Sequence, residues 1–334
     1  MKEGAGTHMV RPMTPADLSA VVQLWNQAAE SRDILHKPLS PEVFAAKFLT
    51  AGPNELKRNV VVEAEGRIVG FGNAYHKLEA DLGYVTFVLV DPACRRRGVG
   101  SAILAALEDW LRSFPSIAKI NLNFFNPINL EWIIPGTPGH DHPNAPGVDA
   151  LSPALPFFEA RGYTETARQY SYYRTLEGFE LLPKIAERRA ALEAKGTTIT
   201  YYDPAKHYGL NELFDNLGNE DWREKIMSNV NSENPYPVLI VQREGRVGGF
   251  AGPLYVQPSG RGYFAGIGIH SEFRGGGAGS VLFSALCQGL HDIGATFMSL
   301  FTGRENVART IYESAGFVVV HEWACMRKVL QPQP

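Results

Sequence analysis

The chain contains the same sequence pattern twice, and this repeat constrains the fold more than any other feature of its 334 residues. Residues 65–71 read Glu-Gly-Arg-Ile-Val-Gly-Phe, and residues 244–250 read Glu-Gly-Arg-Val-Gly-Gly-Phe, a shift of 179 positions (244 − 65). The same shift places 95–101 on 274–280, two segments that share Arg-x-x-Gly-x-Gly-Ser. Two motifs in one register indicate a duplicated domain.

A third matching segment lies at a different distance. Residues 159–163 read Glu-Ala-Arg-Gly-Tyr and residues 313–317 read Glu-Ser-Ala-Gly-Phe, a shift of 154 positions (313 − 159). The first copy therefore contains 25 extra residues (179 − 154) before this point. They fall in 127–153, which is dense in proline, glycine, histidine and aspartate and predicts a solvated insertion loop.

Each copy predicts the same order of secondary-structure elements. A helix is expected to begin at Pro15 in the first copy and at Pro204 in the second, because proline is tolerated in the first turn of a helix. A hairpin with a Glu-Gly turn follows at 60–75 or 238–256, then a strand, the glycine-rich segment and an amphipathic helix. Another strand, a short helix and a final strand complete each copy. This order predicts an α/β fold of the α+β type: two tandem domains, each a mixed, mostly antiparallel sheet flanked by helices.

The repeat also predicts the domain boundaries. We expect the first domain to span 9–176 and the second 197–330, joined by a charged helical linker at 177–196. The linker ends at a lysine and a glycine, which are typical of a helix C-terminus. Alternatively, it packs as the last helix of the first domain. Residues 1–8 look irregular and stay outside this prediction.

Composition and charge exclude several classes of function. Hydrophobic residues make up 45% and charged residues 20% of the chain, which is normal for a globular protein. The net charge of -3 gives no general basic field for nucleic acid. Cys94, Cys287 and Cys325 show no paired metal-binding spacing and fit a reducing compartment. No apolar run reaches the length of a membrane span, and the N-terminus lacks a signal-peptide core. We therefore expect a cytoplasmic protein that binds neither nucleic acid nor membrane.

The repeated Arg-x-x-Gly-x-Gly motif predicts an anion-binding loop in each copy. In both places the motif follows an apolar strand and opens a helix. Glycine lets the backbone approach a ligand closely, and the first amides of the helix then attract an anion, for which a pyrophosphate is the natural candidate. One such motif would equally fit a plain strand-to-helix turn, but two in the same context favour binding.

The segments around these loops resemble the acetyl-CoA-binding motif of the GNAT acetyltransferase superfamily. The first runs from Val88 to Gly100 and the second from Ile267 to Ser280. Residues 306–317 resemble a later motif of the same family, which ends in Tyr-x-x-x-Gly-Phe. The resemblance covers nearly the whole chain except the insertion, so the chain is identified as a tandem, two-domain member. It implies acetyl-CoA as the cofactor.

In the second copy the resemblance implies a complete acetyl-CoA site. Asn306 would contact the cofactor, and Tyr312 would protonate the departing thiolate, because a phenol is normally protonated at pH 7. The alternative to a catalytic role is that Tyr312 is an aromatic residue that packs in the core. The strand before the loop would splay from the next strand and pair with the pantetheine arm, and one of its amides would polarise the thioester carbonyl. The pantetheine and pyrophosphate contacts would be Ile267, Gly268, Ile269, Arg274, Gly275, Gly276, Gly277, Ala278, Gly279 and Ser280.

In the first copy the resemblance is incomplete at the catalytic position. Phe158 aligns with Tyr312 and has no proton to give, and the stretch before it lacks the asparagine. The first domain is therefore expected to be non-catalytic, although its intact loop predicts that it still holds cofactor. The residues expected to do so are Val88, Leu89, Val90, Arg95, Arg96, Arg97, Gly98, Val99, Gly100 and Ser101.

Two further clusters of polar residues and one single histidine are candidate site residues. Glu220 and Asp221 lie where the resemblance places the wall of the acceptor site, and their carboxylates would attract a cationic amine and take its proton; an exposed acidic loop is the equal alternative. The segment 140–142 reads His-Asp-His, but no spacing pattern supports a metal site there and we predict none. His270 is predicted to be a loop residue rather than a base.

The favoured function is an acetyl-CoA-dependent N-acetyltransferase with its chemistry in the second domain. The acceptor would be an amine on a small molecule or a peptide, and it would attack the thioester directly. The alternative is a CoA-binding sensor or assembly protein without turnover, against which Tyr312 argues. The acceptor's identity and the oligomeric state are not predicted.

Overall fold

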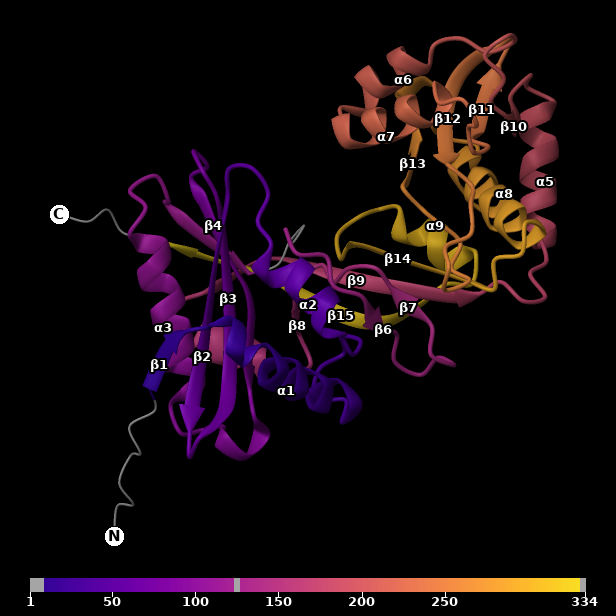
Figure 1. The fold of residues 1–334 in the computed structure, drawn as a ribbon. Helices are drawn as coiled ribbons and strands as arrows, with labels where there is room; N and C mark the ends of the chain where they lie inside the picture. Colours follow the sequence, from indigo (N-terminus) through magenta and orange to yellow (C-terminus); the bar gives the residue numbers. More distant parts are fainter. Residues whose placement is uncertain (1–8, 123–126, 331–334) are drawn as a thin grey trace. The chain divides into compact units, whose positions relative to one another are not determined.

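The computed structural model describes residues 9–122 and 127–330, and the chain divides into two compact units (Figure 1). The first unit combines the chain up to residue 135 with 142–169 and with the segment from 322 onward. The second unit combines 136–141 with 170–321. This division follows the packing rather than the order of the sequence, and it differs from the linear boundaries predicted above.

Among the described residues, the first half of the chain contains eleven strand, helix and turn elements before its insertion and five more in or after it, up to residue 175. They are β1 (Met9–Pro12), η1 (Pro15–Asp17), α1 (Leu18–Glu30), α2 (Pro41–Phe44), η2 (Ala45–Leu49), β2 (Glu55–Ala64), β3 (Arg67–Lys77), β4 (Leu82–Val90), η3 (Pro92–Cys94), α3 (Val99–Arg112), then β5 (Lys119–Leu122), β6 (Trp132–Ile133), β7 (Asp141–His142), β8 (Val148–Asp149), α4 (Ala154–Glu159) and β9 (Thr164–Thr175).

The second half repeats this order with an added helix at its start. Its elements are α5 (Pro183–Glu193), β10 (Thr198–Tyr201), α6 (Leu210–Leu217), α7 (Glu220–Val230), β11 (Leu239–Arg243), β12 (Arg246–Gly252), β13 (Gly266–Ile269), η4 (Ser271–Phe273), α8 (Ala278–Asp292), β14 (Phe297–Gly303), α9 (Arg309–Ser314) and β15 (Val318–Val329). The predicted mixed α/β architecture with two helix-flanked sheets is confirmed.

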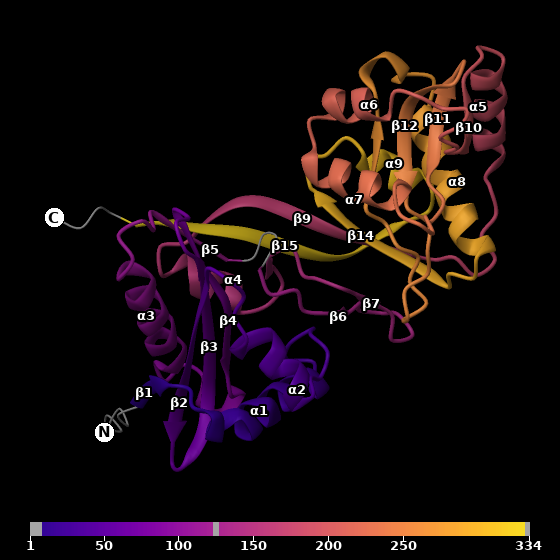
Figure 2. The same ribbon diagram turned by 45° about the horizontal axis from the view of Figure 1, so that its top comes forward.

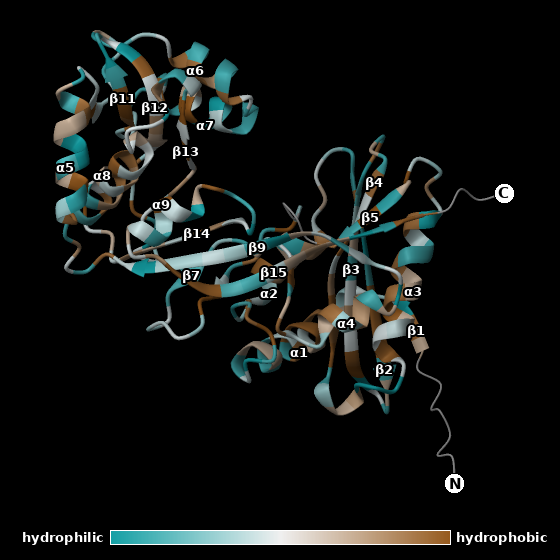
Figure 3. Ribbon diagram, turned by 180° about the vertical axis from the view of Figure 1, so that it is seen from behind, coloured by the Kyte–Doolittle hydropathy of each residue, from teal (hydrophilic) through white to brown (hydrophobic). Residues whose placement is uncertain are grey.

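In each unit helices cover both faces of the central strands, β2–β4 in the first unit and β11–β13 in the second (Figure 2). In β2, Val60 and Val62 pack in the core beneath α3, whereas Val61 lies in the core beneath α1. Successive side chains of a strand point to opposite faces, so a strand covered on both sides is apolar throughout. In the second unit α6 and α7 cover one face of the sheet, and α5 and α8 the other. Figure 3 shows the hydrophobic residues concentrated on strands such as β11 and β12.

The two Glu-Gly hairpins form as predicted and are geometrically equivalent. Glu65 and Gly66 have φ angles of 52° and 72°, and Glu244 and Gly245 have φ angles of 52° and 82°. Positive φ at both central residues gives the turn that matches the twist of the flanking strands. The ladder shifts register just before each turn, in the same place in both copies.

The first helix of the second copy begins later than predicted. Asp203 accepts a hydrogen bond from the Ala205 amide at 2.9 Å, which closes a short turn rather than a helix. The helix α6 begins at Leu210, after Gly209 in the left-handed region. The segment predicted to be a linker contains α5, whose Ile185 and Leu192 lie in the core of the second unit. The alternative that it closes the first domain is therefore wrong.

The final strand of each copy begins in the unit of its own copy and ends in the other unit. The end of β15 pairs with β5 in the first unit, where Met326 lies opposite Leu122. The end of β9, from Tyr170 onward, belongs to the second unit, and β9 neighbours β14 in the strand order. Each unit is thus completed by a strand from the other half of the chain.

The insertion 127–153 is not the solvated loop that the sequence predicted. Trp132 and Ile134 are almost fully buried, and Val148 in β8 pairs with Ala324 of β15. Burial of these apolar side chains stabilises the first unit even though the segment has little regular structure.

In the described part of the chain, no helix is both long and apolar enough to cross a membrane.

Candidate active sites

The strand before the glycine loop splits away from its neighbour in the second unit. In the first unit β4 pairs with β5 over residues 82–84, and the chain that follows β5 lies outside the described residues, so a split is described only for the second unit. In the second unit the Gly262 amide donates to the Phe297 carbonyl at 2.8 Å, but β13 pairs only with β12 among the described strands. A split of this kind leaves one side of a strand available to an extended ligand, as the sequence predicted.

The glycine loops share positive φ angles at two of three equivalent positions, and they differ at Gly276, whose equivalent Arg97 has no positive φ. Gly275, Gly276 and Gly277 have φ angles of 86°, 62° and 82°, and Gly277 caps the N-terminus of the 15-residue helix α8. In the first unit Arg96, at the position of Gly275, also has a positive φ of 61°. Consecutive amides in such conformations form a concave anion-binding surface at the helix N-terminus.

The arginine at the head of each loop fastens the loop to the preceding strand. Arg274 donates from Nε to the Ile269 carbonyl at 3.0 Å, and Arg95 donates to the Val90 carbonyl at 3.2 Å. Arg95 also makes two hydrogen bonds to the carboxylate of Asp33. Both guanidinium groups therefore help to shape the loop, and the side chain of Arg95 is further occupied by Asp33.

One contact is equivalent in the two units although its two partners are related by different sequence shifts, 179 for the glycine and 154 for the apolar residue. This agreement confirms the repeat in three dimensions. A side chain at Gly100 would touch Phe157, and a side chain at Gly279 would touch Ile311. Asn306 accepts from the Ala308 amide at 2.9 Å, and Ser152 accepts from the Ala154 amide at 3.2 Å. Ser152 therefore does locally what Asn306 does, which the residue types alone did not indicate.

Tyr312 lies on α9 inside an aromatic cluster of the second unit. Its ring centroid is 4.9 Å from that of Phe283 and 5.9 Å from that of Tyr172, and the residue is 5% exposed. Burial, helped by the neighbouring Tyr172, raises the pKa of Tyr312 to about 12. Its hydroxyl keeps its proton at neutral pH, as a general acid requires. Phe158 is the equivalent residue in the first unit.

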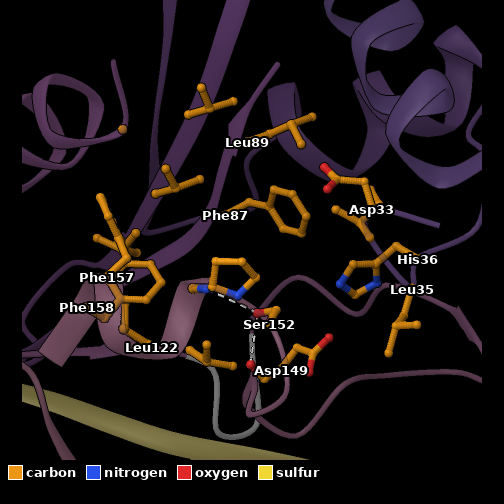
Figure 4. Close-up of a pocket in the computed structure, with 18 of the residues that line it drawn as sticks. Asp33, Leu35, His36, Phe87, Leu89, Leu122, Asp149, Ser152, Phe157 and Phe158 are labelled. Carbon is orange, nitrogen blue, oxygen red and sulfur yellow. Dashed lines mark hydrogen bonds between the residues drawn. The ribbon is translucent and has the colours of Figure 1, made fainter. Parts of the chain in front are cut away.

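The first unit contains a cleft of about 290 Å³ beside β4, lined by residues 85–90 of that strand (Figure 4). Phe157 and Phe158 lie toward one side of it, and His36 and Asp33 toward the other. The cleft also borders Arg96 of the glycine loop. Mostly apolar walls with a few polar groups are typical of a small-molecule site.

His36 is the polar group in this cleft with the most unusual environment. Its Nδ1 atom has no hydrogen-bond partner in the described part of the chain. Burial lowers the pKa of His36 to about 4, against the opposing effects of the Glu131 backbone and the Asp149 carboxylate. The imidazole is therefore neutral at pH 7. Sequence reasoning missed Asp33, His36 and Asp149, because nothing in their spacing marks them as neighbours.

The structure places the predicted acceptor-wall residues on the first turn of α7. Glu220 forms an ion pair with Arg223 at 3.0 Å, and its side chain is 77% exposed. The indole of Trp222 covers Gly266 at the start of β13, so that a side chain at this position would collide with it. Asp221 is also exposed. The carboxylates thus lie in solvent beside a packed tryptophan.

The histidines that the sequence singled out have structural contacts. His270 accepts from the Glu272 amide at 3.2 Å and caps η4, as expected for a loop residue. His140 stacks on Phe297 with ring centroids 3.8 Å apart, and His142 hydrogen-bonds the Asn144 carbonyl at 3.0 Å. Within the described residues, no group of three or more histidine, cysteine or acidic side chains is arranged to hold a metal ion.

These features define a class of protein: an α/β acyltransferase fold, present twice. A model of the acetyltransferase (GNAT) family matches residues 21–131 and 201–317, and the chain belongs to this family. The predicted tandem GNAT membership is thereby confirmed. The family and the fold support acyl transfer in general. A comparison with curated protein sequences gives no significant match.

Solved structures with the same fold span both units. A GCN5-related N-acetyltransferase from Sphaerobacter thermophilus has a TM-score of 0.63 and 18% identity, covering 98% of this chain and 97% of that one. A tandem GNAT protein from the clavulanic acid biosynthesis pathway has a TM-score of 0.57 and 16% identity, covering 98% of this chain and 100% of that one.

A third similar structure is much longer than this chain. It is a GCN5-related glucosamine N-acetyltransferase region in a fungal multi-domain GH3 β-N-acetylglucosaminidase, with a TM-score of 0.67 and 18% identity. The match covers 96% of this chain but only 38% of the fungal one. At these low identities the likenesses establish the fold.

Proposed function

We propose that this protein is an acetyl-CoA-dependent N-acetyltransferase whose chemistry takes place in the second unit. One observation carries the proposal: that unit combines a split strand, a glycine loop and a protonated tyrosine, Tyr312, in place of Phe158. Acetyl-CoA would lie with its pyrophosphate at 274–280 and its pantetheine arm along β13. The second unit's residues fit this cofactor because the loop backbone is open at Gly275, where a side chain would meet no atom within 4 Å.

The proposed reaction is direct transfer. The amine nitrogen attacks the thioester carbonyl, an amide of β13 polarises the carbonyl oxygen, and the bond to sulfur then breaks. The cationic amine must first lose one proton, to a carboxylate or to water, so that its nitrogen has a lone pair for the attack. As the bond to sulfur breaks, Tyr312 gives its proton to the thiolate, and the second proton lost by the nitrogen restores the tyrosine. The acceptor is a cationic amine on a small molecule or a peptide. We place the enzyme in a reducing compartment such as the cytoplasm, because its three cysteines are unpaired and buried.

A charge placed in the loop tests the cofactor position. Gly275→Asp puts a carboxylate beside the expected pyrophosphate, and Gly275→Asn is its neutral control of the same shape. Aspartate and asparagine both tolerate a positive φ, and Arg96 shows that a side chain fits at this position of the loop. Calorimetry should show CoA binding to the second unit weakened at least tenfold by Gly275→Asp and little by Gly275→Asn. Equal affinities in the two variants would place the cofactor elsewhere.

The acceptor wall is tested by removing charge without changing shape. If Glu220 or Asp221 guides a cationic amine, the Glu220→Gln, Asp221→Asn double variant should raise KM for the amine severalfold. Since both side chains are exposed, a larger effect is not expected. CoA affinity should stay the same. Unchanged steady-state kinetics would leave the two residues as a solvated surface of α7.

A CoA-binding protein without turnover is the competing proposal, and the first unit is its best support. Its cleft is built like an acyl-CoA site but presents Phe158 where the acid should be. Release of free CoA during incubation with a panel of amines separates the two functions. Release with any amine excludes the sensor, whereas binding without release across the panel favours it.

A further inference from the structure

Helix α5 lies against the glycine loop of the second unit and presents one face to it. Ile185 and Leu192 of this face are 3% and 7% exposed and belong to the core that α8 also enters. A side chain at Gly276 would lie 3.3 Å from Leu192. Residues 185, 188 and 192 share one side of a helix, because their spacing of three and four residues matches its turn.

Arg188 therefore projects from α5 onto the loop. A Cβ atom at Gly277 would lie 3.0 Å from Cδ of Arg188 and 3.4 Å from its Nε. Gly277 is the residue that caps the N-terminus of α8. The Nε atom of Arg188 therefore lies close to the amides that are expected to hold the pyrophosphate.

Arg188 has no ionic partner among the residues that the structure describes, in contrast to its neighbour. Arg189 donates to Glu193 at 3.0 Å, an ordinary pair along the exposed side of the helix. Arg188 is also exposed, but its side chain lies against Gly277, and none of the described carboxylates pairs with it. A cation beside a set of amide donors, without a counter-charge among the described residues, is suited to an anionic ligand.

The two loops differ in charge in a way that agrees with this position. The first loop carries Arg96 and Arg97, whereas the second has Gly275 and Gly276 at the same places. The second loop therefore has no cation of its own apart from Arg274, which is engaged with the strand. Arg188 supplies from α5 the charge that the first loop contains in its own sequence.

We infer that Arg188 is a phosphate-binding residue of the second unit and contacts a phosphate group of CoA. The inference rests on the proposed function, because it takes CoA to be the ligand of this loop. Arginine suits the role since its planar guanidinium can donate two parallel hydrogen bonds to a phosphate. Helix α5, expected from the sequence to be only a linker, thereby becomes part of the cofactor site.

Calorimetry on the full chain tests this with Arg188→Ala and the matched control Arg189→Ala. The probes are CoA, dephospho-CoA, which lacks the 3′-phosphate, and pantetheine, which has no phosphates. Arg188→Ala should weaken CoA about tenfold at the second unit, as expected for a charged hydrogen bond near solvent. Arg189→Ala should change nothing. Arg188→Lys should recover part of the affinity.

The three probes identify the contact. A loss with both CoA and dephospho-CoA indicates the pyrophosphate, and a loss with CoA alone indicates the 3′-phosphate; either supports the role. An unchanged affinity for CoA, or an equal loss with pantetheine, overturns it. The Gly275→Asp variant keeps the two proposals apart: if it weakens CoA while Arg188→Ala does not, only the role of Arg188 is wrong. If neither variant affects CoA, the proposed cofactor site itself fails.

Discussion

Tyr312→Phe is expected to lower kcat by about 10²- to 10⁴-fold while leaving CoA affinity nearly unchanged. The substitution keeps the ring, and with it the packing against Phe283 and Tyr172. It removes only the hydroxyl, so the packing of α9 should be kept. The thiolate then leaves without its proton donor. Steady-state kinetics with acetyl-CoA and the best amine of the panel measures the effect.

The reciprocal change in the first unit is the control. Phe158→Tyr restores the hydroxyl but should not create a second active centre, because the Asn-x-x-Ala pattern before Tyr312 is missing before Phe158, and Ser152 reproduces only the local turn of Asn306 and not its side-chain amide. We expect wild-type kcat in this variant. The hypothesis that the second unit carries the chemistry is wrong if Tyr312→Phe retains full activity in a protein that still binds CoA.

The raised pKa of Tyr312 predicts how kcat depends on pH. A tyrosine with an ordinary pKa begins to lose its proton near pH 10, but Tyr312 keeps its proton to about pH 12. The acid form is therefore present throughout the neutral and mildly alkaline range. A loss of kcat as pH falls below 7 would have to come from protonation of the amine or of its base, and Tyr312→Phe should leave that limb of the pH profile in place.

Met326→Ala should destabilise the first unit by about 2–5 kcal/mol, although Met326 lies at the far end of the chain. Met326 is 1% exposed and packs in the core of the first unit, beside Ala324 and the strand that ends at Leu122. Removing its side chain leaves a cavity under β5. Hydrogen exchange followed by mass spectrometry should show faster exchange in β2, β3 and α3.

Met298→Ala provides a matched control for this experiment. Met298 is also fully buried, but it lies in β14 and packs in the core of the second unit. The same truncation there should loosen α8 and leave the first unit protected. If Met326→Ala instead loosens the second unit, β15 stays with its own copy in solution and the exchange of strands is wrong.

Several features of this protein follow from local sequence, and the structure bears them out. The hairpin turns at Glu65 and Glu244 depend on glycine at the next position, and the glycine loops depend on residues that adopt positive φ. The length and start of α8 follow from its apolar spacing and from Gly277 before it. Each of these is decided by neighbours within a few residues, so the sequence predicts it. The contrast between Tyr312 and Phe158 needs only the repeat register.

Tertiary structure alone decided which segments meet. The final strands β9 and β15 occupy equivalent places in the two copies, and nothing in their local sequence specifies which strands they pair with, because a sheet edge accepts any strand with suitable alternation. The composition of the insertion predicted a solvated loop, yet the side chains of Trp132 and Val148 are buried in the structure. The placement of Arg188 over Gly277 depends on the docking of α5, an interaction between residues 89 positions apart (277 − 188). Such contacts depend on the summed packing of distant segments, which no local pattern in the sequence specifies.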